Sequence, residues 1–194
     1  MNHSEKAIKE SIAELVPEIP DFRDIPKIDL YMEQVTTFLD DALSGMKRNK
    51  KDKIFTKTMI NNYTKDGVID PPHRKKYGPD HMMTLIYIYF MKQSLSIHDI
   101  SDVLKLLPEN MPDKELYELY KSIIQTYTDG IENKLTHEYE LVKKTMQNDD
   151  KKCLMMLITQ LATEAAINKM MATTLLDKYK EIIKSKSDKE KEQK

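Results

Sequence analysis

The stretch from Thr56 to Leu104 reads TKTMINNYTKDGVIDPPHRKKYGPDHMMTLIYIYFMKQSLSIHDISDVL and decides the fold class. It contains a short polar helix signal, a glycine turn, a loop with two prolines and several cations, and two further helix signals. That order is typical of a small winged helix-turn-helix, and it makes double-stranded DNA the first partner to test.

The first part of this stretch predicts a helix over residues 56–66. Thr56 is a favourable N-cap residue, and Gly67 is a common residue just after a helix end. Three apolar residues share one face and are expected to point inward: Met59, Ile60 and Tyr63. The opposite face carries Lys57, Thr58, Asn61, Asn62 and Lys65. Asparagine side chains on such a face can bridge the N6 and N7 atoms of adenine, and lysines can reach phosphates or guanine.

The loop that follows is expected to form a basic wing. Pro71 and Pro72 exclude a helix there, and Val68-Ile69 is too short for more than a β-bridge. The wing residues are His73, Arg74, Lys75, Lys76 and Tyr77. For Tyr77, packing under the wing and contact with phosphate both remain open.

Two more helices are predicted after the wing. Gly78-Pro79-Asp80 is a helix start, with proline at the first helical position and an acid near the positive end of the helix. Residues 84–91 are continuously apolar, which fits a strand or a buried helix, and the proline start favours the helix. Ser96 followed by Asp99 is a capping signal for the next helix.

Outside this stretch the chain is predicted to be helical. A helix is expected over residues 4–16 and another from Asp29 to Leu43, with a proline-spaced connector between them and a basic loop over 46–53. Apolar residues then recur at three- and four-residue steps over 113–147 and 151–183. Gly130 is a possible interruption of the first of these segments.

We therefore expect an all-α chain with four parts. Residues 1–28 are an N-terminal helix and connector, and 29–108 are a winged helix-turn-helix domain with a short wing. Residues 109–184 are a long helical pair, and 185–194 are a disordered tail. The helical pair is expected to form a homodimer, because a two-fold symmetric dimer lets a small DNA-binding domain bind two half-sites.

Charge is distributed unevenly along the chain, although the net charge is only −1. Residues 1–46 carry ten acids and four bases, which gives −6, and residues 47–76 carry ten bases and three acids, which gives +7. A local cluster of cations is the electrostatic footprint of a nucleic-acid-binding element, although a solvated basic surface fits it equally well.

Other classes of function find little support in the residues. The five histidines lack the spacing of metal ligands, and no nucleophile lies beside a base, so neither a metal site nor an enzyme is predicted. No glycine-rich loop suggests a nucleotide cofactor. Cys153 is the one cysteine and no apolar run approaches ~20 residues, so we expect a cytoplasmic protein without disulfides or membrane contact. No effector is indicated.

The same residues resemble the N-terminal domain of MerR-type regulators. The matching features are Gly67-Val68-Ile69 after the recognition helix, the wing over 71–76, Tyr77, and the run Leu95-Ser96-Ile97-His98-Asp99-Ile100. More closely, the runs IDLYMEQVTTFLDDAL and TKTMINNYTKDG resemble the bacterial family called domain of unknown function 1836, over residues 20–175. The resemblance implies a winged helix-turn-helix that binds DNA, although MerR-type regulators usually carry an arginine where this chain has Asn61.

Two functions fit these residues. The first is a DNA-binding transcriptional regulator of MerR-like type. Its predicted DNA-contacting residues are Lys57, Thr58, Asn61, Asn62, Lys65, Arg74, Lys75, Lys76, Tyr77, Lys50, Lys51 and Lys53. The second is a helical protein-interaction module that keeps the fold without binding DNA, in which the acidic N-terminal region covers the cations.

Overall fold

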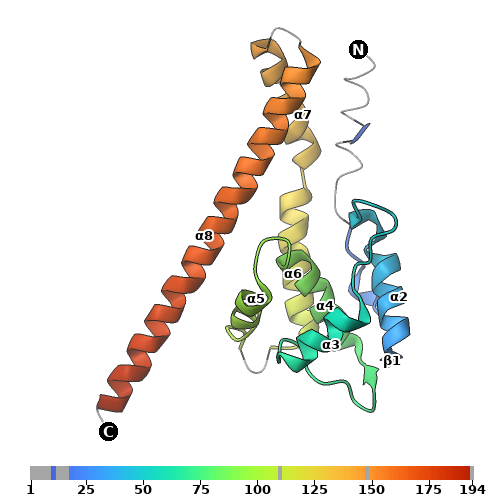
Figure 1. The fold of residues 1–194 in the computed structure, drawn as a ribbon, viewed down its shortest axis with the longest axis vertical. Helices are drawn as coiled ribbons and strands as arrows, with labels where there is room; N and C mark the ends of the chain where they lie inside the picture. Colours follow the sequence, from blue (N-terminus) through green and yellow to red (C-terminus); the bar gives the residue numbers. More distant parts are fainter. Residues whose placement is uncertain (1–9, 12–17, 109–110, 147–148, 193–194) are drawn as a thin grey trace.

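A computed structural model describes residues 10–11, 18–108, 111–146 and 149–192. The chain is largely α-helical, as predicted (Figure 1). The predicted helix over 4–16 lies mostly outside the described residues. The elements in chain order are a 3-10 helix Phe22–Asp24, β1 Leu30–Tyr31, α2 Met32–Ala42, a 3-10 helix Ser44–Met46, α3 Lys57–Lys65, β2 Lys76–Tyr77, α4 Pro79–Met91, α5 Ile97–Leu104, α6 Asp113–Thr128, α7 Ile131–Thr145 and α8 Asp150–Glu192.

The helix predicted from Asp29 begins three residues later, because its first residues form a strand. β1 pairs with β2 in antiparallel register, with Leu30 opposite Tyr77 and Tyr31 opposite Lys76. Two residues on each side are enough to tie the predicted wing to the start of α2. No local propensity marks such a short strand, since its partner lies more than 40 positions away in the sequence.

Helix α3 has the predicted boundaries and caps. The backbone N–H of Met59 donates to Thr56 Oγ1 at 3.2 Å, which is a normal N-cap bond. Gly67 has a φ of +68°, and the next two backbone N–H groups donate to the carbonyl of Tyr63. The chain therefore turns sharply after α3, and Val68 and Ile69 enter the core.

The continuously apolar segment over 84–91 is helical, which confirms the buried-helix interpretation. Helix α4 contacts α2, β2 and α6, so its side chains are buried around most of its circumference. The fully buried side chains of this core are Ile25, Val35, Leu39, Leu43, Phe55, Ile60, Met82, Leu85, Ile86, Ile88 and Ile100.

The C-terminal region differs from the prediction at two points. Gly130 adopts a φ of +79° and separates α6 from α7, so the segment over 113–147 is two helices. Helix α8 continues through Glu192, where the sequence predicted a disordered tail from residue 185. Lysine and glutamate are good helix formers, so the end of α8 extends without an apolar anchor.

Helix α8 packs on α7 with its first turns and diverges from the body of the protein beyond them (Figure 1). Nearer its C-terminal end α8 also contacts α5, and there Leu176 is buried. There Lys180 Nζ lies 2.6 Å from Asp102 Oδ2 and 3.7 Å from Asp99 Oδ1. The ammonium groups of Lys180 and Lys105 lower the pKa of Asp102 to about 2. Between these two contacts α8 leaves a long apolar surface exposed.

Among the residues that the structure describes, no helix combines the length and apolar character needed to cross a membrane.

Candidate nucleic-acid interface

The outward face of α3 is arranged as the sequence predicted. Its five polar residues are all exposed: Lys57, Thr58, Asn61, Asn62 and Lys65. On the opposite face Ile60 is buried, while Met59 and Tyr63 are partly buried against the core. The packing of these three side chains sets the rotation of α3 about its own axis, and this rotation turns both asparagines to solvent.

The predicted wing is a tight β-hairpin with a basic tip. The backbone N–H of Lys76 donates to the carbonyl of His73 at 2.9 Å, and Arg74 and Lys75 form the two-residue tip. Both have positive φ, at 49° and 66°. Asparagine and glycine are the usual residues in such a turn, and a side chain with a Cβ costs about 1–2 kcal/mol at each position. The fold therefore holds two exposed cations in an unfavourable backbone conformation.

Two of the other three wing residues, Lys76 and Tyr77, face the protein, whereas His73 is exposed. The ammonium of Lys76 lies 5.1 Å from the ring centroid of Tyr31, a cation–π contact across the β1–β2 pair. Tyr77 is only 3% exposed, and burial raises its pKa. Its hydroxyl is hydrogen-bonded to the side chain of Thr64 in α3. Of the two roles left open for Tyr77, it therefore takes the packing role, and its placement among the DNA-contacting residues is corrected.

The structure brings α3 and the hairpin together but separates them from the basic loop. Lys57, at the start of α3, pairs with Glu33 at the start of α2, whereas Lys53 pairs with Asp40 near the end of α2. The segment between these lysines therefore runs alongside α2. An eleven-residue helix is about 16 Å long, so Lys50 and Lys51 lie a helix length from the hairpin. In Figure 1 the hairpin and α3 occupy the lower end of this domain.

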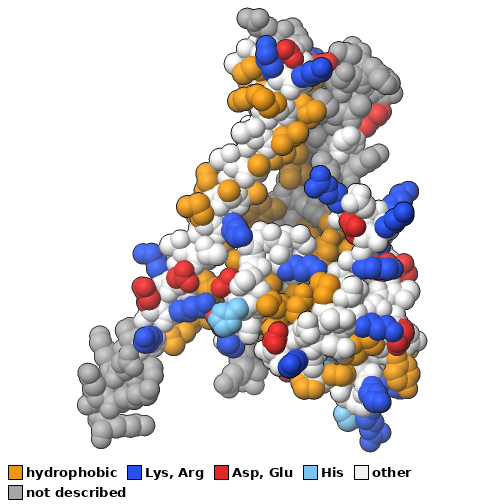
Figure 2. Space-filling model, in the orientation of Figure 1, with side chains coloured by type: hydrophobic (Ala, Val, Ile, Leu, Met, Phe, Trp, Pro, Cys, Tyr) orange, Lys and Arg blue, Asp and Glu red, His pale blue; other side chains and the backbone are white. Residues whose placement is uncertain are grey.

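We call the α3–hairpin face the set of exposed polar residues on α3 and at the hairpin tip. Its members are Lys57, Thr58, Asn61, Asn62, Lys65, Arg74 and Lys75. Within the described ranges, no ion pair is found for Lys65, Arg74 or Lys75. Figure 2 shows lysine and arginine side chains at this end of the molecule, with others spread over the rest of the same face.

Acidic groups of α2 neutralise part of the predicted cation cluster. The carboxylate of Glu33 accepts a hydrogen bond from Lys57, and this bond lowers the pKa of Glu33. Asp40 Oδ2 lies 2.8 Å from Lys47 Nζ and 3.1 Å from Lys53 Nζ, and its other oxygen accepts from the backbone N–H of Ile54 at 3.2 Å. The pKa of Asp40 falls to about 2, mainly through the bond to Lys47. Asp40 therefore anchors both ends of the basic loop to α2.

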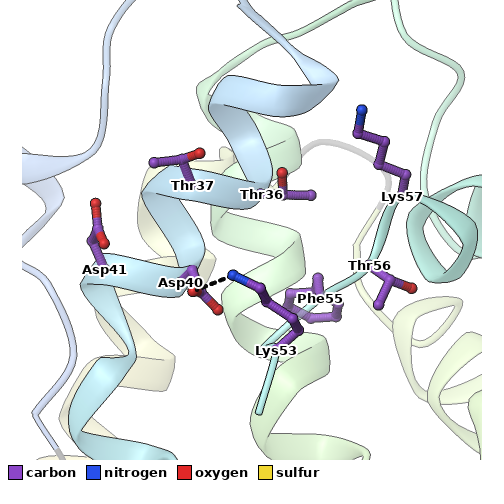
Figure 3. Close-up of a pocket in the computed structure, with 8 residues that line it drawn as sticks. All are labelled: Thr36, Thr37, Asp40, Asp41, Lys53, Phe55, Thr56 and Lys57. Carbon is purple, nitrogen blue, oxygen red and sulfur yellow. Dashed lines mark hydrogen bonds and ion pairs between the residues drawn. The ribbon is translucent and has the colours of Figure 1, made fainter. Parts of the chain in front are cut away.

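A cavity of about 430 Å³ lies between α2 and the segment that leads into α3 (Figure 3). Its walls combine carboxylates, ammonium groups and threonines: Thr36, Thr37, Asp40, Asp41, Lys53, Phe55, Thr56 and Lys57. The ion pair across it, between Lys53 and Asp40, joins α2 to the segment that leads into α3. Because both signs of charge line the cavity, it favours no single class of charged ligand.

Replacing Asp40 by asparagine should destabilise the fold in a pH-dependent way. The depressed pKa of Asp40 means that its contribution is present above about pH 4 and is lost as the pH falls toward 2. Because the carboxylate is partly exposed, we expect a loss of about 1–2 kcal/mol at pH 7. Urea unfolding of Asp40→Asn and the parent chain at pH 7 and pH 2.5 should show this difference shrinking in acid.

The matched control for that experiment is Asp41→Asn, which removes the adjacent exposed carboxylate. An equal loss in the control, or a loss for Asp40→Asn that is the same at both pH values, would show that the bonds of Asp40 do not supply the stability.

Three residues that organise the site were absent from the predicted set. They are Glu33 and Asp40, which pair with the lysines, and His81, which bridges the two ends of the hairpin loop. For His81 a signal was available, since it occupies the third position of α4, where a side chain often bonds back to the N-cap N–H. For the two acids only the tertiary fold supplies the partner.

The fold and this site define a largely helical protein with a short basic hairpin beside a polar helix. The chain belongs to the family described as "Domain of unknown function (DUF1836)", whose sequence model matches residues 20–129. The resemblance predicted over residues 20–175 is thus shown for residues 20–129, and the match ends at the α6–α7 break. No curated protein and no solved structure matches the chain.

Proposed function

We propose that this protein is a cytoplasmic DNA-binding transcriptional regulator with a MerR-like winged helix-turn-helix core. In this proposal α2 and α3 are the helix-turn-helix, α3 is the recognition helix, and the hairpin is the wing. The observation that carries the proposal is the α3–hairpin face, where exposed asparagines and cations without ion pairs in the described ranges lie at the same end of the domain.

The distribution of roles follows the geometry of that face. Asn61 and Asn62 are exposed hydrogen-bonding residues on a helix, which is what readout of base edges requires. Arg74 and Lys75 lie at the tip of the wing and supply phosphate contacts. Lys65 adds a third cation on α3. MerR-type regulators usually carry an arginine at the position of Asn61. In this proposal the cations of the wing make the phosphate contact in its place.

Fluorescence anisotropy with a labelled random duplex tests the proposal directly. At low salt we expect binding at micromolar protein, and an affinity that falls steeply with added salt because counterions are released from the phosphates. No binding under these conditions would overturn the proposal.

The proposal includes a homodimer formed through the C-terminal helices. Along α8, exposed apolar side chains recur at alternating steps of four and three residues: Leu154, Ile158, Leu161, Ala165, Ala172, Leu175, Tyr179 and Ile182. Asn168 interrupts this α8 stripe near its midpoint. Figure 2 shows hydrophobic side chains running along the upper part of α8. This spacing is typical of a coiled-coil seam, in which a single polar residue fixes the register of the two helices.

Replacing Arg74 by asparagine together with Lys75 by glycine should stabilise the fold and weaken DNA binding. Glycine removes the cost at position 75, and asparagine, which still carries a Cβ, lowers it only in part at position 74, so we expect a rise in the free energy of unfolding of about 1–2 kcal/mol. The thermal midpoint should then rise by about 2–8 °C, whereas affinity for DNA should fall because two cations are lost.

The matched comparison is Arg74→Ala with Lys75→Ala, which removes the same charges but keeps the Cβ atoms at positive φ. Its thermal midpoint should stay near that of the parent chain. If Arg74→Asn with Lys75→Gly does not raise the thermal midpoint, positive φ at the tip does not cost the free energy that we assign to it.

The second candidate is a helical protein-interaction module without DNA binding. Its support is the neutralisation of Lys57 and Lys53 by Glu33 and Asp40, since DNA would have to compete with these carboxylates. The anisotropy experiment separates the two candidates, because only this one predicts no salt-dependent affinity for duplex DNA.

A further inference from the structure

One side chain, His81, bonds to both ends of the loop over residues 70–78. Asp70 is where the loop leaves the core, and Gly78 is where it returns. The backbone N–H of Gly78 donates to His81 Nδ1 at 3.1 Å, and His81 Nε2 lies 3.1 Å from the carbonyl oxygen of Asp70. A backbone N–H only donates and a carbonyl only accepts, so Nδ1 accepts in the first bond and Nε2 donates in the second. We call this pair of bonds the His81 bridge.

The bridge is built into the core rather than formed at the surface. His81 is only 8% exposed, and its ring lies edge-on to that of Tyr77 with centroids 5.3 Å apart. Asp80 Oδ2 also lies 3.2 Å from Nδ1, on the side of the ring that faces Gly78. Breaking the bridge would leave the Asp70 carbonyl and the Gly78 N–H without these partners, at the two points that define the base of the loop.

The conformation of the hairpin tip requires such support. Arg74 and Lys75 both adopt positive φ, a conformation that persists in residues with a Cβ only where the surrounding structure holds it. The β1–β2 pair fixes one side of the hairpin, through Lys76 and Tyr77. His73 is bridged only to Lys76 within the hairpin, and the segment from Asp70 to Pro72 has no strand partner among the described residues. Its connection to the core at Asp70 is the bond to His81.

We infer that His81 is a positioning residue for the hairpin tip: through its two backbone bonds it sets where Arg74 and Lys75 stand relative to α3. The structural half of this inference stands by itself. The functional half, that the bridge sets how many phosphates the tip contacts, rests on the proposed DNA binding.

Three substitutions separate bridging from packing. In His81→Asn the side-chain oxygen replaces Nδ1 and keeps the bond from Gly78. In His81→Gln the amide nitrogen replaces Nε2 and keeps the bond to Asp70. His81→Leu fills the space without either bond. His98→Ala, which removes a largely exposed histidine on α5, is the control.

The first readout is trypsin cleavage after Arg74 and Lys75, with cleavage in the loop over 47–53 as the internal reference. We expect cleavage at the tip to rise about fivefold for each bond lost, so that the leucine variant is cleaved fastest and the asparagine and glutamine variants are intermediate. His98→Ala should match the parent chain. Slow cleavage in His81→Leu, or equal acceleration in both loops, would overturn the inference.

The second readout is the salt dependence of DNA binding by anisotropy. In His81→Leu, loss of the bridge should flatten the slope of log K against log salt. The variant Arg74→Ala with Lys75→Ala should show the same flattening. A triple variant that carries all three substitutions should flatten the slope no further. An unchanged slope in a variant whose tip is cleaved faster would overturn the functional half. If the parent chain binds no DNA, the proposed function fails, and the trypsin result still decides the structural half.

Discussion

Replacing Arg74 and Lys75 by alanine should weaken binding to every DNA duplex by about 30-fold at 0.15 M salt and about 200-fold at 0.05 M, if each residue neutralises one phosphate. Both side chains are exposed at the hairpin tip and have no ion pair within the described part of the chain, so no internal partner offsets their loss. The slope of log K against log salt should become shallower by about 1.8. Anisotropy titrations over this salt range measure both effects.

A matched control removes the same charge elsewhere. Lys144 and Lys178 are exposed on α7 and α8, and their replacement by alanine should leave both affinity and slope nearly unchanged. If the control lowers affinity as much as the tip variant, net charge rather than the α3–hairpin face determines binding, and the assignment of the wing is wrong.

Replacing Leu161 and Leu175 by glutamate should convert the proposed dimer into monomers. Both side chains are exposed on the α8 stripe of a single chain, so the change should not disturb the fold of one protomer. In a dimer it would bury like charges along the seam, at a cost of several kcal/mol. Sedimentation should report half the parent mass. Affinity for a duplex with two half-sites should fall roughly 100-fold, because avidity is lost.

The control for this experiment is Thr163→Glu with Thr174→Glu, which adds the same charge to exposed positions of α8 outside the stripe. This variant should remain dimeric and should bind DNA as the parent chain does. A parent chain that sediments as a monomer at micromolar concentration would remove the dimer from the proposal and leave the DNA-binding test intact.

Local signals predicted the central helices well, because the atoms that form those signals lie close together in the sequence. Thr56 caps α3 through a bond to Met59, and Ser96 and Asp99 form the capping box of α5. Gly67 terminates α3 at positive φ. Each of these contacts spans no more than four residues, so sequence spacing alone was sufficient to find it.

The errors fall where the partner of a residue lies far away in the chain. β1 was assigned to a helix because Leu30 and Tyr31 pair with residues 76–77. Tyr77 stands among the predicted DNA-contacting residues with its packing role left open, because nothing in the sequence indicates its burial against His81 and Thr64. Gly130 is a signal for the α6–α7 junction, but a weak one, because apolar residues recur at helical spacing on both sides of it.

By itself the sequence determined the helical class, the boundaries and caps of α3 and α5, and the outward face of α3, because helix periodicity and capping act over a few residues. Only the tertiary structure decided which cations of residues 47–76 pair with carboxylates and which remain exposed without an ion pair in the described part of the chain. Lys53 and Lys57 are neutralised by Asp40 and Glu33. Lys50 and Lys51 lie a helix length away, and Arg74 and Lys75 are held at the hairpin tip. The reason is that electrostatic interactions depend on distance in space, and the chain must fold before cations adjacent in sequence acquire different neighbours.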